Sequence, residues 1–121
     1  MMRKPDLERR MHDELVTLVQ SRLRLNKNES AMTFIGYGVG GINGELDILR
    51  IRDGVPFAVY EIKLNNHYDT KRKAKIQLNK ISEYFGHTVY CIYVSKKNRH
   101  DLVAEIVYKP EWRNEKWITQ H

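Results

Sequence analysis

Two acidic residues stand inside short apolar runs of the kind that form β-strands. Asp47 lies in the run GELDIL, and Glu61 lies 14 positions later in the run VYEIK. Because successive side chains of a strand point to opposite faces, Glu61 and Lys63 are expected on one face. The Asp53-Gly54 pair between the two runs favours a tight hairpin turn. Such a hairpin would bring Asp47, Glu61 and Lys63 side by side.

Two carboxylates beside an ammonium group suggest a particular chemistry. Carboxylate oxygens on adjacent strands are suitable ligands for a hard divalent cation such as Mg²⁺ or Mn²⁺. The ammonium group of Lys63 can orient a water molecule or stabilise the negative charge that develops on a phosphoryl group. The three residues therefore favour metal-assisted cleavage of a phosphodiester bond. A structural ion pair on a solvated sheet face is the alternative interpretation.

The elements that would position these residues follow from the hydrophobic pattern. We expect one domain over residues 1–121, because a chain of this length builds a single core. The expected elements in chain order are a helix at 6–25, a strand at 31–35, a glycine-rich loop at 36–41, the two acidic strands, a loop at 65–69, a helix at 70–85, a strand at 88–95 that is apolar on both faces, and a short helix at 101–107. This order predicts an α/β fold with a mixed sheet flanked by helices.

The charge balance favours a polyanionic partner. Lys and Arg total 21 against 15 Asp and Glu, which gives a formal net charge of +6. Such a surplus is typical of nucleic-acid-binding proteins. A group of cations crowds the predicted helix at 70–85 and can neutralise phosphates or form an ordinary solvated face. This group consists of Lys71, Arg72, Lys73, Lys75 and Lys80.

Other classes of protein are disfavoured by the sequence. The single cysteine, Cys91, lies in an apolar run and can form no intramolecular disulfide, which fits a reducing intracellular setting. The sequence holds no stretch that is long and apolar enough to be a signal peptide or a membrane span. His67, His87 and His100 lack the mutual spacing of a zinc site. We therefore expect a soluble, cytoplasmic protein without a membrane partner.

The pattern of Asp47 followed by Glu61-Ile62-Lys63 resembles the PD-(D/E)xK nuclease superfamily, with Asp47 at the first acidic position and Glu61 to Lys63 as the E-x-K signature. The compact size is most similar to archaeal-type Holliday junction resolvases and their viral relatives. The first motif of the family often reads Pro-Asp, whereas Glu45-Leu46 precede Asp47 here, closer to a Gly-Glu-x-Asp variant. The resemblance spans roughly residues 14–85. It implies a restriction-endonuclease-like core and a Mg²⁺-dependent endonuclease that cleaves branched DNA, with Mn²⁺ as a substitute metal.

The resemblance also implies further site residues. A carboxylate from the first helix should complete the metal site, and we expect Glu14, because it falls within the apolar stripe, where an unpaired charge is unfavourable. Glu8, at the edge of that stripe, is the alternative. The backbone carbonyl of Ile62 is expected as another metal ligand. Gln77 on the second helix would position water or phosphate, or would be a half-buried amide without a role.

A symmetric cut of a four-way junction needs two active sites, and one chain of 14.4 kDa supplies one. The sequence therefore predicts a homodimer with twofold symmetry. Its interface would draw on the aromatic residues Tyr84, Phe85, Trp112 and Trp117. Two other functions stay open. One is a small nuclease of the same fold that acts on nicked, single-stranded or duplex DNA, and the other is a nucleic-acid-binding protein without catalysis.

Overall fold

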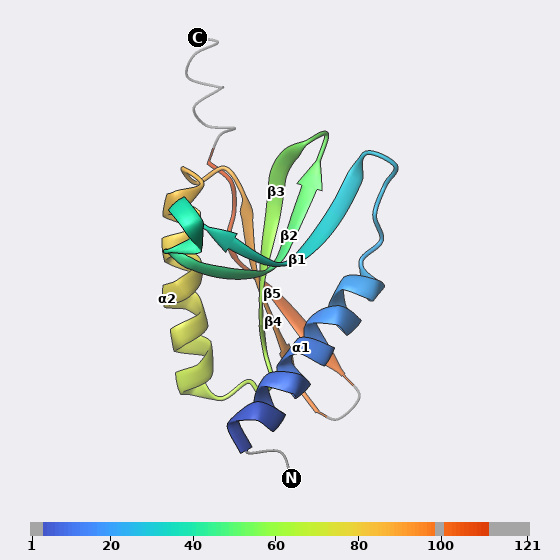
Figure 1. Ribbon diagram of the computed structural model, residues 1–121, viewed down its shortest axis with the longest axis vertical. Helices are drawn as coiled ribbons and strands as arrows, with labels where there is room; N and C mark the ends of the chain where they lie inside the picture. Colours follow the sequence, from blue (N-terminus) through green and yellow to red (C-terminus); the bar gives the residue numbers. More distant parts are fainter. Residues whose placement is uncertain (1–3, 99–100, 112–121) are drawn as a thin grey trace.

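The computed structural model of the protein describes residues 4–98 and 101–111. Within those residues, five strands form one mixed sheet, and α1 and α2 lie on its two sides (Figure 1). The elements are α1 (Lys4–Arg22), β1 (Glu29–Tyr37), the short 3-10 helix η1 (Val39–Gly41), β2 (Gly44–Arg52), β3 (Val55–Lys63), α2 (Tyr68–Tyr84), β4 (Tyr90–Lys96) and β5 (Leu102–Tyr108). The predicted α/β class with a mixed sheet and flanking helices is confirmed. Neither described helix has the length and apolar character needed to cross a membrane.

The strands lie across the sheet in sequence order, from β1 to β5. β3 and β4 run parallel, whereas the other neighbouring strands of the described chain are antiparallel. A parallel pair needs a crossover connection, and α2 supplies it. The β2–β3 hairpin turns at Asp53 and Gly54, whose φ values of 52° and 75° fit the predicted tight turn. Lys63 therefore stands at the end of β3, where it pairs with Ser95 of β4.

Each helix packs against one face of the sheet through a stripe of buried side chains. The α2 stripe includes Ala74, Leu78 and Ile81, at the predicted helical spacing. The α1 stripe consists of Leu15, Val16 and Val19. The side chains of β3 alternate between the two cores, because Val59 packs with the α2 stripe while Tyr60 and Ile62 pack with the α1 stripe. Glu61 and Lys63 consequently share the side that faces α2, as the strand period predicts.

The last predicted helix is wrong. Residues 101–107, expected as a short helix, lie mostly in β5, which pairs antiparallel with β4. The sequence of β5, LVAEIVY, is rich in β-branched residues, which suit a half-buried pleated surface better than a short helix. The predicted helix boundaries also shift, because α1 ends at Arg22 and α2 begins at Tyr68. α2 therefore begins two residues before the expected start at residue 70, with His67 as its N-cap residue.

An ion cluster joins β1 to β2 at the end of the sheet away from Asp47. Glu29 accepts hydrogen bonds from Arg50 at 3.0 and 3.1 Å, from Arg52 at 3.1 Å and from the backbone N–H of Asn26 at 2.9 Å. The Arg52 guanidinium stacks on Phe57, 3.6 Å from the ring centroid. The hydrogen bonds from Arg50 are the main cause that lowers the pKa of Glu29 from 4.5 to about 2. The carboxylate is therefore stabilised in its charged form.

Changing Glu29 to Gln should lower the melting temperature at neutral pH. Because the folded-state pKa lies below the ordinary value, the stabilisation by this carboxylate is present above pH 4.5 and is lost as the pH falls toward about 2. Thermal melting followed by circular dichroism should therefore separate the variant from the unchanged protein at pH 7. The two curves should approach each other as the pH falls. Equal melting temperatures at pH 7 would contradict a stabilising role for the cluster.

Candidate functional site

β2 bends at Asp47. Phe34 of β1 stands opposite Asp47, between the residues that pair with Ile48 and Leu46. Its φ of 55° is a backbone conformation that costs an ordinary residue on the order of 1–3 kcal/mol. Leu46 packs in the α2 core and Ile48 in the α1 core, although a regular strand would point both to one face. The bend thus places Asp47 between the α1 core and the α2 core.

Asp47 is buried and already hydrogen-bonded. Its Oδ2 atom accepts a hydrogen bond of 2.8 Å from the backbone N–H of Ile62 on β3. The same oxygen lies 3.3 Å from Nε2 of His12 on α1. Contacts from a strand on one side and a helix on the other therefore fix the position of this carboxylate.

Glu61 is even more deeply buried, with 3% of its surface exposed against 7% for Asp47. The Nζ atom of Lys63 lies 3.3 Å from Glu61 Oε1. The other oxygen, Oε2, is buried, and no described residue donates a hydrogen bond to it. Burial, and next the charge of Asp47, raise the pKa of Glu61 from 4.5 to about 7. The hairpin thus brings Asp47, Glu61 and Lys63 together, and it leaves one carboxylate oxygen in need of a positive partner.

His12 is the site residue that the sequence analysis missed. Its Nε2 atom lies 3.0 Å from the backbone oxygen of Ile62, in addition to its contact with Asp47. Nδ1 lies 3.4 Å from Asp13 on the same helix. The contact with Asp47 is the main cause that raises the pKa of His12 to about 9, so the imidazolium form donates to its neighbours at neutral pH. The sequence held one signal for this placement. His12 precedes Leu15 and Val16 by three and four positions, which puts the three residues on one face of the helix.

Glu14 does not lie at the site, and its expected inward placement is wrong. Its side chain is 66% exposed, and its Oε1 atom lies 3.2 Å from Nε of Arg10. The predicted stripe was out of phase, because Leu7, Met11 and Leu18 are 47%, 43% and 40% exposed while Leu15, Val16 and Val19 are buried. The alternative, Glu8, is exposed as well. His12 therefore occupies the place on α1 where a carboxylate was expected.

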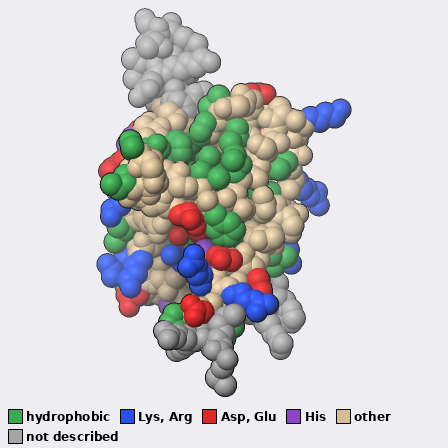
Figure 2. Space-filling model, in the orientation of Figure 1, with side chains coloured by type: hydrophobic (Ala, Val, Ile, Leu, Met, Phe, Trp, Pro, Cys, Tyr) green, Lys and Arg blue, Asp and Glu red, His purple; other side chains and the backbone are tan. Residues whose placement is uncertain are grey.

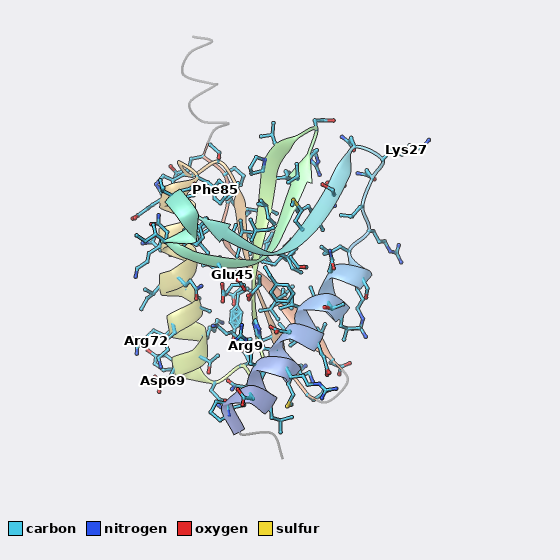
Figure 3. The ribbon with its side chains drawn as sticks, viewed as in Figure 1. Arg9, Lys27, Glu45, Asp69, Arg72 and Phe85 are labelled. Atoms are coloured by element: carbon cyan, nitrogen blue, oxygen red, sulfur yellow. The ribbon has the colours of Figure 1, made fainter. Side chains whose placement is uncertain are left out.

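The cations of α2 occupy different environments. Lys71 and Lys75 lie 2.8 and 3.9 Å from the carboxylate of Glu105 on β5. Arg72 lies 4.0 Å from Asp69, and both side chains are on the outer side of α2 in Figure 3. Lys73 and Lys80 are exposed, and Gln77 is half-buried. The five cations therefore do not form one equivalent surface.

The aromatic residues expected at a dimer interface are partly described. Tyr84 is 49% exposed and lies edge-on to Phe85, with 5.1 Å between ring centroids. Phe85 itself is partly buried against the α2 core. Trp112 and Trp117 lie outside the described residues.

The donor atoms at the site fit a divalent cation in part. Within the described residues, no group of three or more His, Cys, Asp and Glu side chains is arranged to hold a metal ion. Two buried carboxylates are nevertheless adjacent, and the Glu61 Oε2 atom has no described hydrogen-bond partner. Together with the Ile62 carbonyl they supply oxygen ligands of the kind that Mg²⁺ and Mn²⁺ prefer. If a cation were bound by the Ile62 carbonyl, the contact of His12 with that carbonyl would have to change.

The site lies toward the space between α1 and α2. Figure 3 shows Glu45 and Arg9 in that space, and Figure 2 shows charged side chains of both signs at the surface there. A buried carboxylate pair with an adjacent lysine and histidine can bind a cation or exchange protons with a substrate. Comparisons of this chain with models of known protein families, with curated protein sequences and with solved structures found no match.

Proposed function

We propose that this protein is a metal-dependent DNA endonuclease with a restriction-endonuclease-like core, acting on branched DNA and foremost on four-way Holliday junctions. The observation that carries the proposal is the buried carboxylate of Glu61. It lies beside Asp47 and Lys63, and its Oε2 atom has no described partner. A fold gains no stability from an unsatisfied buried carboxylate, so such a group is a candidate for binding or catalysis. The basic composition of the chain supports a nucleic-acid substrate.

Each residue of the site would have its own role in metal binding or cleavage. Asp47, Glu61 and the Ile62 carbonyl would hold Mg²⁺ or Mn²⁺, and the bound ion would activate water and stabilise the leaving oxygen. Lys63, next to Glu61, would orient the attacking water and balance negative charge on the phosphate. His12 would position Asp47 through its hydrogen bond, as neighbouring groups do for metal ligands in general. Gln77, half-buried on α2, would contact water or phosphate.

Two features of assembly and setting belong to this proposal. A homodimer would place two sites on opposed strands of a junction. Its interface would use the exposed part of Tyr84 and the neighbouring Phe85. We also propose a cytoplasmic setting, which the single cysteine supports because it can form no intramolecular disulfide.

A second candidate is a nucleic-acid-binding protein without catalysis. The observation that favours it is that each carboxylate already has a cationic neighbour. His12 contacts Asp47, and Lys63 contacts Glu61. In that case the four residues form a buried ion network, and added Mg²⁺ would change neither stability nor the DNA.

Incubation with labelled DNA tests the proposal. We expect cleavage of a four-way junction in Mg²⁺ or Mn²⁺, no cleavage in EDTA, and weaker cleavage of a linear duplex of the same sequence. Light scattering should give about twice the chain mass of 14.4 kDa. Equal cutting of junction and duplex would favour a general nuclease. No cutting of junction, nicked, single-stranded or duplex DNA by the folded protein with either metal would refute catalysis and favour the second candidate.

A further inference from the structure

The cations on α1 and α2 differ in their partners: Arg10, Lys71, Arg72 and Lys75 each lie within ion-pair distance of a carboxylate, whereas Arg9, Lys73 and Lys80 have no such partner among the described residues. We call the surface between the two helices, where Figure 3 shows Glu45 and Arg9, the interhelix surface. The difference holds on both helices. It bears on where a polyanion would bind.

On α1 the contrast is between two adjacent arginines. Arg10 lies 3.2 Å from Glu14. Arg9 forms no ion pair with any described carboxylate, and it precedes His12 by three positions, so both lie on one helix face. Figure 3 shows Arg9 on the interhelix surface. Both arginines border one surface concavity with Asp6, Asp13 and Glu14, but only Arg10 is paired with a carboxylate.

On α2 the contrast is between two flanks of the helix. Lys71 and Lys75 share the flank that faces β5, where both contact Glu105. Lys73 and Lys80 lie on the opposite flank, in the helical row that continues through Gln77 to Tyr84. No described carboxylate lies within ion-pair distance of either lysine.

The flank with Lys73 and Lys80 faces β1. Tyr84, at the end of this row, lies edge-on to Tyr37 of β1, with 5.2 Å between ring centroids. Tyr37 is buried in the core that packs against α2. The row therefore lies on the flank of α2 that faces β1, on the same side of the sheet as Glu61.

We propose that the interhelix surface binds one phosphodiester backbone of a nucleic acid, with Arg9 on the α1 side and Lys73 and Lys80 on the α2 side contacting phosphates. The proposal rests on the proposed function and specifies its substrate-binding surface. Lys71 and Lys75 are excluded from it, since Glu105 already neutralises their charge.

The charges of the interhelix surface fit this partner. Cations without carboxylate partners gain most from phosphates, because ion pairs formed with phosphates release counterions from the nucleic acid. Glu45 is exposed on the same surface, and its negative charge would repel a phosphate there. A strand that follows the two cationic sides would pass Glu45 and reach the carboxylate pair between them. The competing surface is a groove on the other flank of α2, lined by Tyr68, Lys71, Arg72 and Lys75.

Two double variants of α2 with the same change in charge provide the test. Binding of a labelled DNA duplex is measured by fluorescence anisotropy in EDTA from low to high salt. Lys73→Ala with Lys80→Ala should weaken binding and reduce the slope of log K against log salt by up to about 1.8, or roughly 0.9 for each lost contact. Lys71→Ala with Lys75→Ala should leave the slope unchanged. The reverse result, or equal losses in the two variants, would overturn the proposal and favour the competing groove or a diffuse field.

Single variants of the adjacent arginines test the α1 side in the same assay. Arg9→Ala should reduce the slope by up to about 0.9, and Arg10→Ala should leave it unchanged. Lys73→Arg with Lys80→Arg should keep the slope, which separates the effect of charge from folding defects. An RNA duplex of the same sequence shows whether the site prefers DNA.

Because EDTA prevents cleavage, DNA binding with the predicted slopes but no cutting in Mg²⁺ would refute only the nuclease proposal. Normal cutting together with unchanged slopes in the Arg9 variant and in the Lys73/Lys80 double variant would refute only the proposed binding surface. A protein that binds no nucleic acid would also refute the proposed binding surface.

Discussion

Changing Glu61 to Gln is expected to reduce cleavage by on the order of 10²-fold or more, equivalent to about 2.7 kcal/mol in activation free energy. The amide keeps the shape of the side chain but removes the charge that would hold the metal. The same change should leave the protein at least as stable, because it removes a buried charge whose Oε2 atom has no described partner. Loss of activity without loss of stability is the combination expected of a catalytic residue.

The pH dependence of stability gives this prediction a second readout. The folded-state pKa of Glu61, about 7, lies above its ordinary value of 4.5. The unchanged protein therefore loses stability as the pH rises from 4.5 through 7, and the variant does not. Melting temperatures at pH 5 and pH 8 should show the variant gaining relative to the unchanged protein. Glu45→Gln, a change of an exposed glutamate near the same end of the hairpin, is the control and should affect neither melting nor cleavage by as much.

A folded Glu61→Gln protein that cuts DNA at the normal rate would refute the proposed catalytic role of Glu61. A variant that is inactive and also much less stable would instead support the structural ion network. The two readouts therefore separate the proposed nuclease from the second candidate.

Replacing His12 by Ala is expected to lower cleavage by about 10- to 100-fold, the usual effect of removing a group that orients a metal ligand. His12 contacts both Asp47 Oδ2 and the Ile62 carbonyl, so its loss would leave two of the expected ligand atoms without the contact that positions them. The concentration of Mg²⁺ or Mn²⁺ needed for half-maximal cleavage should rise. DNA binding in EDTA should stay nearly constant, because His12 is not among the proposed phosphate contacts.

Glu14→Gln on the same helix is the matched control. Its exposed carboxylate contacts Arg10 and not the site, so cleavage and metal requirement should stay within a factor of about two, the small effect typical of an exposed ion pair. If Glu14→Gln stopped cleavage and His12→Ala did not, the functional residue on α1 would be Glu14 and not His12.

The sequence predicted those parts of the structure that depend on neighbours along the chain. The Asp53-Gly54 turn and the strand period together placed Glu61 and Lys63 on one face, next to Asp47. The spacing of Ala74, Leu78 and Ile81 likewise identified the buried side of α2. In each case a local rule of backbone geometry determines the outcome. The residues 101–107 did not follow such a rule, because a helix and a strand were both compatible with that short apolar stretch until β4 offered a partner.

The helix-borne part of the site was decided by the tertiary structure. α1 carries two overlapping apolar rows, one with Leu7, Met11 and Leu18 and one with Leu15, Val16 and Val19, and its sequence does not state which row faces the sheet. Packing on the bent face of the sheet buries the second row and exposes the first. That rotation carries Glu14 to solvent and brings His12 to Asp47, two residues 35 positions apart in the chain. The bend opposite Phe34 is likewise a product of strand pairing, since it forms only when two separate segments meet.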